Sequence, residues 1–514
     1  MDPSTTHGAV DPASPAPTPA RDPETLPSEL FSKILGNLDL ASAKELRLSS
    51  KSLAEKCLGP EFTSHFAHQK TDLSASSLEG LAALASHKVL APAVSHLTVL
   101  STTFDLQGLT KQVSTKRRTV TTTNGPIFSS TEERLTEEEL KRAEDELAWC
   151  RAQIEEREKQ TDESVIDSLA SSLKAFEKLD TLDIEGAVST DMGSGSAPPH
   201  TIRDWQSLWV RNTKVFRLVM LAIARSGVPV KTLTVFRSTN RCSVPAGDVT
   251  ALLPQLDAEP NAAVALGAVE NFAISVSTPV QLDAAKIDAK VATLEGIDQV
   301  WHRAFGSNTG QFSAADPEAS ADENFPGVAG LLGRMPNLEA FDVHLYSTLT
   351  NGLSEAWWKM FARIADEVEL PRLEQVMIRG LPAREDELLT FLRKHHGINE
   401  LMINEMSLES GRWQPVFDYF AKATALTKLH LANLFDGGYV VSLELAEGRD
   451  IGRDPDPRDY FPCTGGPSKV FKRSFEEETI RAGLVFKDEP MGRPLGSPQL
   501  MWWRNKRKAD FGPP

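Results

Sequence analysis

The cysteines and histidines are the side chains of this sequence that could ligate a metal or act as nucleophiles. The four cysteines are Cys57, Cys150, Cys242 and Cys463. They lie far apart, form no C-x-x-C pair and have no neighbouring histidine cluster, which argues against a zinc site and a disulfide framework and favours reduced structural thiols. We interpret His395 and His396 as cations at the end of a helix, not as metal ligands.

Motifs that carry covalent chemistry are not found either. The sequence has no phosphate-binding loop, no G-x-S-x-G nucleophile elbow and no H-E-x-x-H zinc motif. Its 71 Asp and Glu residues form no supported catalytic constellation, and most are expected to be surface charge. We therefore expect a protein that is not an enzyme and that needs no metal or cofactor.

Charge and hydropathy disfavour two classes of partner. The formal net charge of −16 disfavours nucleic acid, whose recognition relies on clustered cations. No run of about 18 uncharged apolar residues exists to span a bilayer. The N-terminus does not resemble a secretory signal, so we expect the chain in the cytoplasm, the nucleus or both. The basic run RNKRK at 504–508 is either a nuclear localisation signal or simply a solvent-exposed end of the chain.

The elements that would position functional side chains are indicated by a recurring L-x-x-L-x-L pattern, whose last apolar positions alternate as in a half-buried strand. It begins at Val94, Leu179, Val230, Val269, Leu338, Leu373, Ile398 and Leu426. Helical apolar spacing at 354–368, 384–396 and 411–423 separates the last four strands. The starts of these units are 35, 25 and 28 residues apart, close to the leucine-rich-repeat period. Such units must stack to bury their apolar faces, which predicts a curved parallel sheet with outer helices.

In each unit the residues that flank the middle apolar position of the strand should point to the concave face of that sheet. These residues are our candidates for contacts with a bound protein. They are Asp342, His344, Gln375, Met377, Arg379, Glu400, Met402, Asn404, Lys428 and His430.

Several segments interrupt or flank the repeats. Residues 132–163 form a charged helical insertion opened by Thr136 and Glu139 as a capping box, which either docks on the solenoid or pairs as a coiled coil with another chain. Residues 305–327 are rich in Gly, Ser, Ala and Asp and predict a surface loop. The Pro-rich residues 1–24 lack the apolar content needed for folding.

The stretch LPSELFSKILGNLDLASAKELRLSSKSL, residues 26–53, is unusually apolar for so short a segment. It predicts three helices, with Pro27 in the first turn, Asp39 capping the second helix, and Ser52 with Glu55 opening the third. So few residues cannot cover all their own apolar surface, so part of it should be buried by a partner.

These positions resemble the F-box motif. The matching residues are Leu26, Pro27, Glu29, Ile34, Leu35, Leu38, Arg47, Leu48, Ser50 and Lys51. Ala43 and Leu53 depart from the larger aliphatic residue and the Trp common in that family. With its downstream repeats, the chain is similar to fungal F-box proteins that carry degenerate leucine-rich repeats. The Asn of the standard repeat is replaced by Tyr346, Leu381, Met406 and Leu434.

The resemblance implies an α/β chain with an N-terminal three-helix F-box at 25–65, a leucine-rich-repeat-like solenoid at 66–434 and a C-terminal cap and tail at 435–514. It implies that the F-box docks on the Skp-type adaptor, and through it a cullin, of an SCF ubiquitin ligase, while the solenoid binds a protein substrate. The implied adaptor-binding residues are Leu26, Pro27, Leu30, Ile34, Leu35, Leu38, Leu46, Leu48, Ser50 and Lys51. The alternatives are a repeat scaffold outside a ubiquitin ligase, or N-terminal helices that merely cover the first repeat.

Overall fold

The computed structural model divides the chain into two compact units, Met1–Ala67 and His68–Pro514, which we call unit 1 and unit 2. The structure describes residues 23–124, 127–189, 205–239, 242–281, 283, 312–349, 353, 355–436, 439–443 and 472–490. Most of the Pro-rich leader, Cys463 and the basic run at 504–508 lie outside the described residues.

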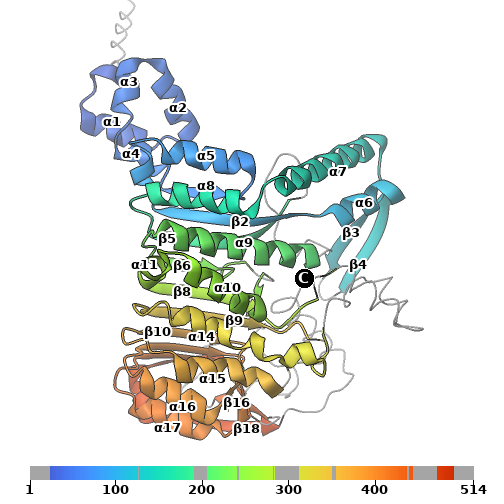
Figure 1. The fold of residues 1–514 in the computed structure, drawn as a ribbon, viewed down its shortest axis with the longest axis vertical. Coiled ribbons are helices and arrows are strands. Elements are labelled where there is room, and N and C mark those ends of the chain that lie inside the picture. The colour runs from blue at the N-terminus through green and yellow to red at the C-terminus, as the bar shows by residue number, and fades with distance from the viewer. Residues whose placement is uncertain are drawn as a thin grey trace, which may run out of the picture. The chain divides into compact units, whose positions relative to one another are not determined.

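Unit 1 is a small helical unit (Figure 1). Its elements are η1 (Pro23–Thr25), α1 (Ser28–Leu35), α2 (Leu40–Ser49), α3 (Lys51–Lys56) and α4 (Pro60–Ser64). The fourth α-helix was not predicted. It starts at Pro60, which suits a first helical turn, and it buries Phe62 completely.

Two capping residues set the helix starts in unit 1. Asp39 accepts a hydrogen bond from Ser42 N at 2.8 Å, which confirms the predicted cap of α2. The predicted start of α3 at Ser52 is wrong, because Ser50 Oγ accepts from Leu53 N at 3.1 Å and opens the helix earlier. Ser50 can take this role because its extended backbone already breaks α2.

Within the described residues of unit 2, eleven strands form one sheet. They are β1 (His68–Thr71), β2 (His96–Phe104), β5 (Thr181–Ser189), β6 (Thr232–Val235), β7 (Val244–Pro245), β8 (Asn271–Ser277), β9 (Ala340–Tyr346), β10 (Gln375–Arg379), β12 (Glu400–Asn404), β14 (Lys428–Ala432) and β17 (Lys472–Glu476). Neighbouring strands follow chain order and are parallel, except that β17 runs antiparallel to β14. All eight strands predicted from L-x-x-L-x-L are present, and the α/β class with a mostly parallel sheet is confirmed. The arrangement is compatible with an α/β solenoid.

Helices cover one face of this sheet, which we call the helix face (Figure 1). They are α5 (Ala75–Ala85), α8 (Asp162–Ala175), α9 (Trp205–Ser226), α10 (Ala246–Ala258), α11 (Ala262–Gly267), α14 (Pro326–Leu332), α15 (Trp358–Glu367), α16 (Glu385–Lys394), α17 (Trp413–Lys422) and α18 (Glu477–Ala482). Strand residues of the predicted apolar positions, such as Val343, Ile378 and Ile403, are buried in the core. The alternate residues therefore point to the opposite face, as strand geometry requires.

A left-handed residue follows the strand in several units. Gly380, Glu405 and Asn433 have φ values of 74°, 55° and 52° and directly follow β10, β12 and β14. The turn leads into a second sheet, formed by β11 (Ala383–Arg384), β13 (Ser407–Ser410), β15 (Phe435–Asp436), β16 (Tyr439–Leu443) and β18 (Phe486–Pro490). Leu381, Met406 and Leu434, which replace the Asn of the standard repeat, are all buried. Apolar packing thus fills the place of a polar ladder.

The charged insertion lies between β2 and α8. The whole segment between these two elements consists of α6 (Leu106–Thr115), β3 (Arg117–Asn124), β4 (Ile127–Arg134) and α7 (Glu137–Glu158). The predicted helical insertion at 132–163 therefore begins with the last residues of β4, contains α7 and ends in the first turn of α8. The predicted capping box is confirmed, since Thr136 and Glu139 exchange both hydrogen bonds. Leu147 and Cys150 of α7 pack against Phe104 and Leu109 of the same chain. Of the two predicted placements, α7 therefore takes the intramolecular one.

The predicted surface loop at 305–327 is wrong over its described part. Residues from 312 onward contain η4 (Pro317–Ser320), η5 (Asp322–Asn324) and the start of α14. Phe325 is buried, and Trp357 Nε1, in η6 (Glu355–Trp357), donates to Ala319 O at 2.9 Å. Burial of one large aromatic side chain and one indole hydrogen bond thus orders a segment of loop-like composition.

Candidate protein-binding surfaces

Unit 1 exposes large apolar side chains. Leu30 and Ile34 of α1 are 49% and 46% exposed, and Leu48 of α2 is 87% exposed. Leu30 and Ile34 are four residues apart and so lie on one side of α1. Pro27, just before α1, is also exposed. Pro27, Leu30, Ile34 and Leu48 are the exposed apolar residues that we call the apolar surface of unit 1.

The other residues expected to bind an adaptor divide between surface and core. Lys51 is exposed, and Leu26, Leu38, Leu46 and Ser50 are half-buried. Leu35 is only 1% exposed, so its expected place on the binding face is wrong. It lies on the inner side of α1, as Phe31 does four residues earlier. The adjacent Ile34 and Leu35 therefore have different roles, one on the surface and one in the core.

Lys56 fixes the chain that enters α1, a role that sequence analysis missed. Its Nζ donates to Glu24 O at 2.5 Å and to Leu26 O at 3.0 Å, and it lies 5.8 Å from the centre of the Phe31 ring. These contacts join the end of α3 to the Leu26–Pro27 segment. A Lys with a carbonyl partner thirty residues away in sequence leaves no local pattern, so nothing in the sequence indicated it.

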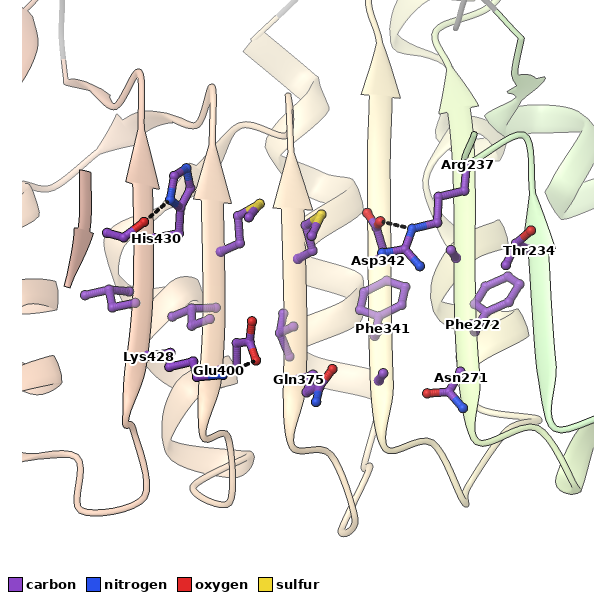
Figure 2. Close-up of a pocket in the computed structure, with 18 of the residues that line it drawn as sticks. Thr234, Arg237, Asn271, Phe272, Phe341, Asp342, Gln375, Glu400, Lys428 and His430 are labelled. Carbon is purple, nitrogen blue, oxygen red and sulfur yellow. Dashed lines mark hydrogen bonds and ion pairs between the residues drawn. The ribbon is translucent and has the colours of Figure 1, made fainter. Parts of the chain in front are cut away.

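The sheet of unit 2 presents a polar second face opposite the helix face (Figure 2). In-register pairing aligns its side chains in rows that cross the strands. One row is Ala273, Asp342, Met377, Met402, His430 and Ser474. The next row is Asn271, Ala340, Gln375, Glu400, Lys428 and Glu476. Both rows line a groove of about 340 Å³.

Seven of the ten residues expected to bind protein line this groove: Asp342, Gln375, Met377, Glu400, Met402, Lys428 and His430. The remaining three, His344, Arg379 and Asn404, occupy the row beyond, nearer the carboxyl ends of the strands. Asn404 Oδ1 is buried there and has no hydrogen-bond partner among the described residues.

Asp342 is the centre of an ion-pair network on this face. Its carboxylate is 3.0 Å from Nε of Arg237 and 3.0 Å from Nη2 of Arg379, while the Asp342 side chain is only 8% exposed. Arg237 follows β6 and reaches across β8 to β9, where Asp342 lies (Figure 2). Sequence analysis missed Arg237 because it lies outside the L-x-x-L-x-L pattern.

The two histidines on the second face of unit 2, His344 and His430, differ in environment. His344 is only 4% exposed, and its burial, assisted by the nearby Arg379 charge, lowers its pKa to about 3. It is therefore neutral and buried, which contradicts its expected role as an exposed contact. His430 is half-buried, and its Nδ1 lies 2.8 Å from Ser474 Oγ. Lys428, one row away, is 63% exposed and lies 3.7 Å from Glu400.

His395, expected as a helix-end cation, is a neutral core residue. It is 3% exposed, and burial is the main cause of its lowered pKa. Nε2 accepts a hydrogen bond from Leu370 N at 3.2 Å, which leaves Nδ1 to donate to Phe391 O at 2.9 Å. Its ring thus links the end of α16 to the segment before β10.

The described residues, 23–124, 127–189, 205–239, 242–281, 283, 312–349, 353, 355–436, 439–443 and 472–490, contain neither a metal site nor a membrane-spanning helix. Within those ranges no group of three or more His, Cys, Asp or Glu side chains is placed to hold a metal ion. No helix in the same part of the chain is both long and apolar enough to cross a bilayer. Cys57, Cys150 and Cys242 are buried, and none of these three forms a disulfide in the described part of the chain. Comparison with family models and with curated proteins gives no match to this sequence.

Proposed function

We propose that the chain is a substrate receptor of an SCF-type cullin-RING ubiquitin ligase, in which unit 1 docks on a Skp-type adaptor and unit 2 binds a protein substrate. The observation that carries the proposal is the apolar surface of unit 1, where Leu30, Ile34 and Leu48 are exposed on two helices that belong to an F-box-like sequence.

The energetics favour a partner at this surface. Burial of a Val, Leu or Ile side chain gains about 1.5–3 kcal/mol relative to full exposure, and half-exposed side chains gain part of that amount. The surrounding fold does not need these side chains, because Phe31, Leu35, Ala43, Leu53, Cys57 and Phe62 already form the interior of unit 1. A small unit can thus keep its fold and still present an apolar docking surface.

The second face of unit 2 supports the substrate half of the proposal. Its groove offers half-buried apolar and charged side chains from strands that a packed helix layer holds rigid. In this function the chain itself performs no covalent step. It accelerates ubiquitin transfer by holding a substrate lysine near the charged carrier, which raises the effective concentration of the reactants.

Co-purification of the full-length chain with a Skp-type subunit tests the adaptor half. Replacing Pro27 and Ile34 together with Ala should abolish recovery of the adaptor, because both side chains are exposed and the core of unit 1 is untouched. Val264→Ala is the matched control, since Val264 is 64% exposed but belongs to α11 of unit 2. Failure of the unaltered chain to recover the adaptor would instead favour the scaffold outside a ubiquitin ligase.

A further inference from the structure

The groove on the second face of unit 2 has an apolar floor at its centre. Met377 of β10 and Met402 of β12 are paired in register on neighbouring strands, and both are half-buried. Unbranched thioether side chains adapt to differently shaped apolar groups. This floor therefore suits a large apolar side chain without demanding one particular shape.

One side of that floor is cationic. Two guanidinium groups, Arg237 and Arg379, share the single carboxylate of Asp342, so the cluster has one positive charge in excess. Arg379 is 21% exposed, whereas Arg237 is 50% exposed and lines the groove. A guanidinium has five N–H donors, and Arg237 uses Nε for Asp342. The exposed part of Arg237 can therefore bind a second carboxylate.

The other side of the floor has no excess of positive charge. There Glu400 and Lys428 form an ion pair, and Glu476 lies in register beside Lys428 on β17. Acidic and basic side chains also alternate along the groove, which disfavours a polyanion such as nucleic acid. The charge preference of the groove is thus confined to the Arg237 end.

We propose that this groove binds an extended segment of a partner protein, with an acidic side chain at Arg237 and a large apolar side chain on the Met377–Met402 floor. Neighbouring strands are about 4.8 Å apart, so Met377 and Met402 lie roughly 5 and 10 Å from the Asp342 position in β9, and the centre of the floor lies about 7 Å from it. In an extended segment, side chains on one side recur about every 6.6–7 Å. The acidic and apolar residues therefore stand two positions apart. The inference rests on the substrate half of the proposed function and not on adaptor binding.

Selection of random linear nine-residue peptides on the immobilised full-length chain tests this inference. Enriched peptides should carry Asp or Glu two positions from Leu, Ile, Met or Phe. In the Arg237→Glu variant the same position should select Lys or Arg, and the affinity of the acidic peptides should fall about tenfold or more. A switch of preference cannot arise from misfolding. Arg363→Glu, on α15 of the helix face, is the matched control and should select the acidic peptides.

Three outcomes would overturn the inference. They are no enriched peptide, enrichment without an acidic position, and an acidic preference that survives Arg237→Glu. Recovery of the Skp-type subunit is measured on the same preparations. If the peptide preference is absent while the adaptor is still recovered, only the proposed peptide binding in the groove is contradicted. If the adaptor is not recovered while the peptide preference is retained, only the proposed role in a ubiquitin ligase is contradicted.

Discussion

Asp72 and Arg157 join two parts of unit 2 that lie 85 residues apart in sequence, with Arg157 Nη2 2.6 Å from Asp72 Oδ2. Arg157 also donates to Thr102 O at 2.8 Å and lies 4.7 Å from the centre of the Phe104 ring. Arg211 of α9 donates to the backbone oxygen of Asp72 at 3.0 Å. The turn after β1 therefore anchors both the end of α7 and the helix face.

Replacement of Asp72 with Asn should destabilise unit 2 by about 2 kcal/mol, because it leaves the Arg157 guanidinium, whose side chain is only 12% exposed, without its counter-charge. Urea unfolding followed by tryptophan fluorescence measures the change. Asp322→Asn is the matched control: Asp322 is 86% exposed, and loss of its pair with Lys359 should cost less than about 0.5 kcal/mol. Equal effects of the two substitutions would contradict the anchoring role of Asp72.

The same ion pair should weaken in acid. Burial alone would raise the pKa of Asp72, but the Arg157 charge and hydrogen bonds from Ser74 outweigh it and hold the pKa below its ordinary value. Because the folded pKa is depressed, the stabilisation is present above the unfolded pKa of about 3.9 and is lost as pH falls through the folded pKa. The free-energy difference between the unaltered chain and Asp72→Asn should therefore shrink only below about pH 4.

His344 should make the stability of unit 2 depend on pH in a range above the one that affects Asp72. Its folded pKa of about 3 lies below the unfolded value of about 6.5, so its stabilisation is complete above pH 6.5 and declines as pH falls toward 3. Linkage gives a loss of about 2 kcal/mol between pH 8 and pH 5. His344→Phe should remove this slope in denaturant titrations at the two pH values. His396→Phe, at an exposed histidine, should leave the slope as it is.

Gly380 should tolerate no side chain. Its φ of 74° is strained for other residues, and an added Cβ would lie 2.5 Å from Leu345 O. Gly380→Ala should therefore cost about 2–3 kcal/mol. Gly80→Ala is the opposite case, because no atom lies within 4 Å of the added Cβ and α5 gains a better helix former, by about 0.5–1 kcal/mol. Thermal unfolding should shift down for the first variant and slightly up for the second.

Substitutions at an exposed and at a buried position of α1 and α2 should distinguish the residues that bind the adaptor from those that stabilise unit 1. Leu48→Asp changes a side chain that is 87% exposed and should reduce adaptor recovery with little effect on resistance to proteolysis. Leu35→Asp buries a charge at a position that is 1% exposed and should make unit 1 sensitive to protease. A protease-sensitive Leu48→Asp variant would show that the Leu48 side chain supports the fold and not only a surface.

The repeated strands and the helix caps could be predicted because each depends on the spacing of residues that are close in sequence. Alternating apolar residues predicted eight strands of the large sheet, β2, β5, β6, β8, β9, β10, β12 and β14, and the caps at Asp39 and Thr136 are short-range patterns. In the second sheet, β11, β13 and β15 escaped prediction because they are only two to four residues long. The burial of Phe325 and Trp357 escaped because long-range packing overrides local loop composition.

The groove could be predicted only in part for the same reason. Strand alternation placed Met377, Met402 and His430 on the second face. It could not distinguish a buried residue such as His344 from an exposed one, because both stand at equivalent strand positions. Arg237 needed three-dimensional information, since it reaches Asp342 from a loop more than one hundred residues earlier in the sequence.

The reversed direction of β17 limits how far the sheet can extend. A further parallel unit would have to pair beside β14, but β17, the last strand of this sheet among the described residues, already occupies that edge. This strand carries the charged residues Lys472, Arg473 and Glu476. Charged side chains on a short last strand discourage pairing with a strand from another molecule. Copies of this chain are thereby hindered from joining end to end into fibres, although each presents a long series of parallel strands.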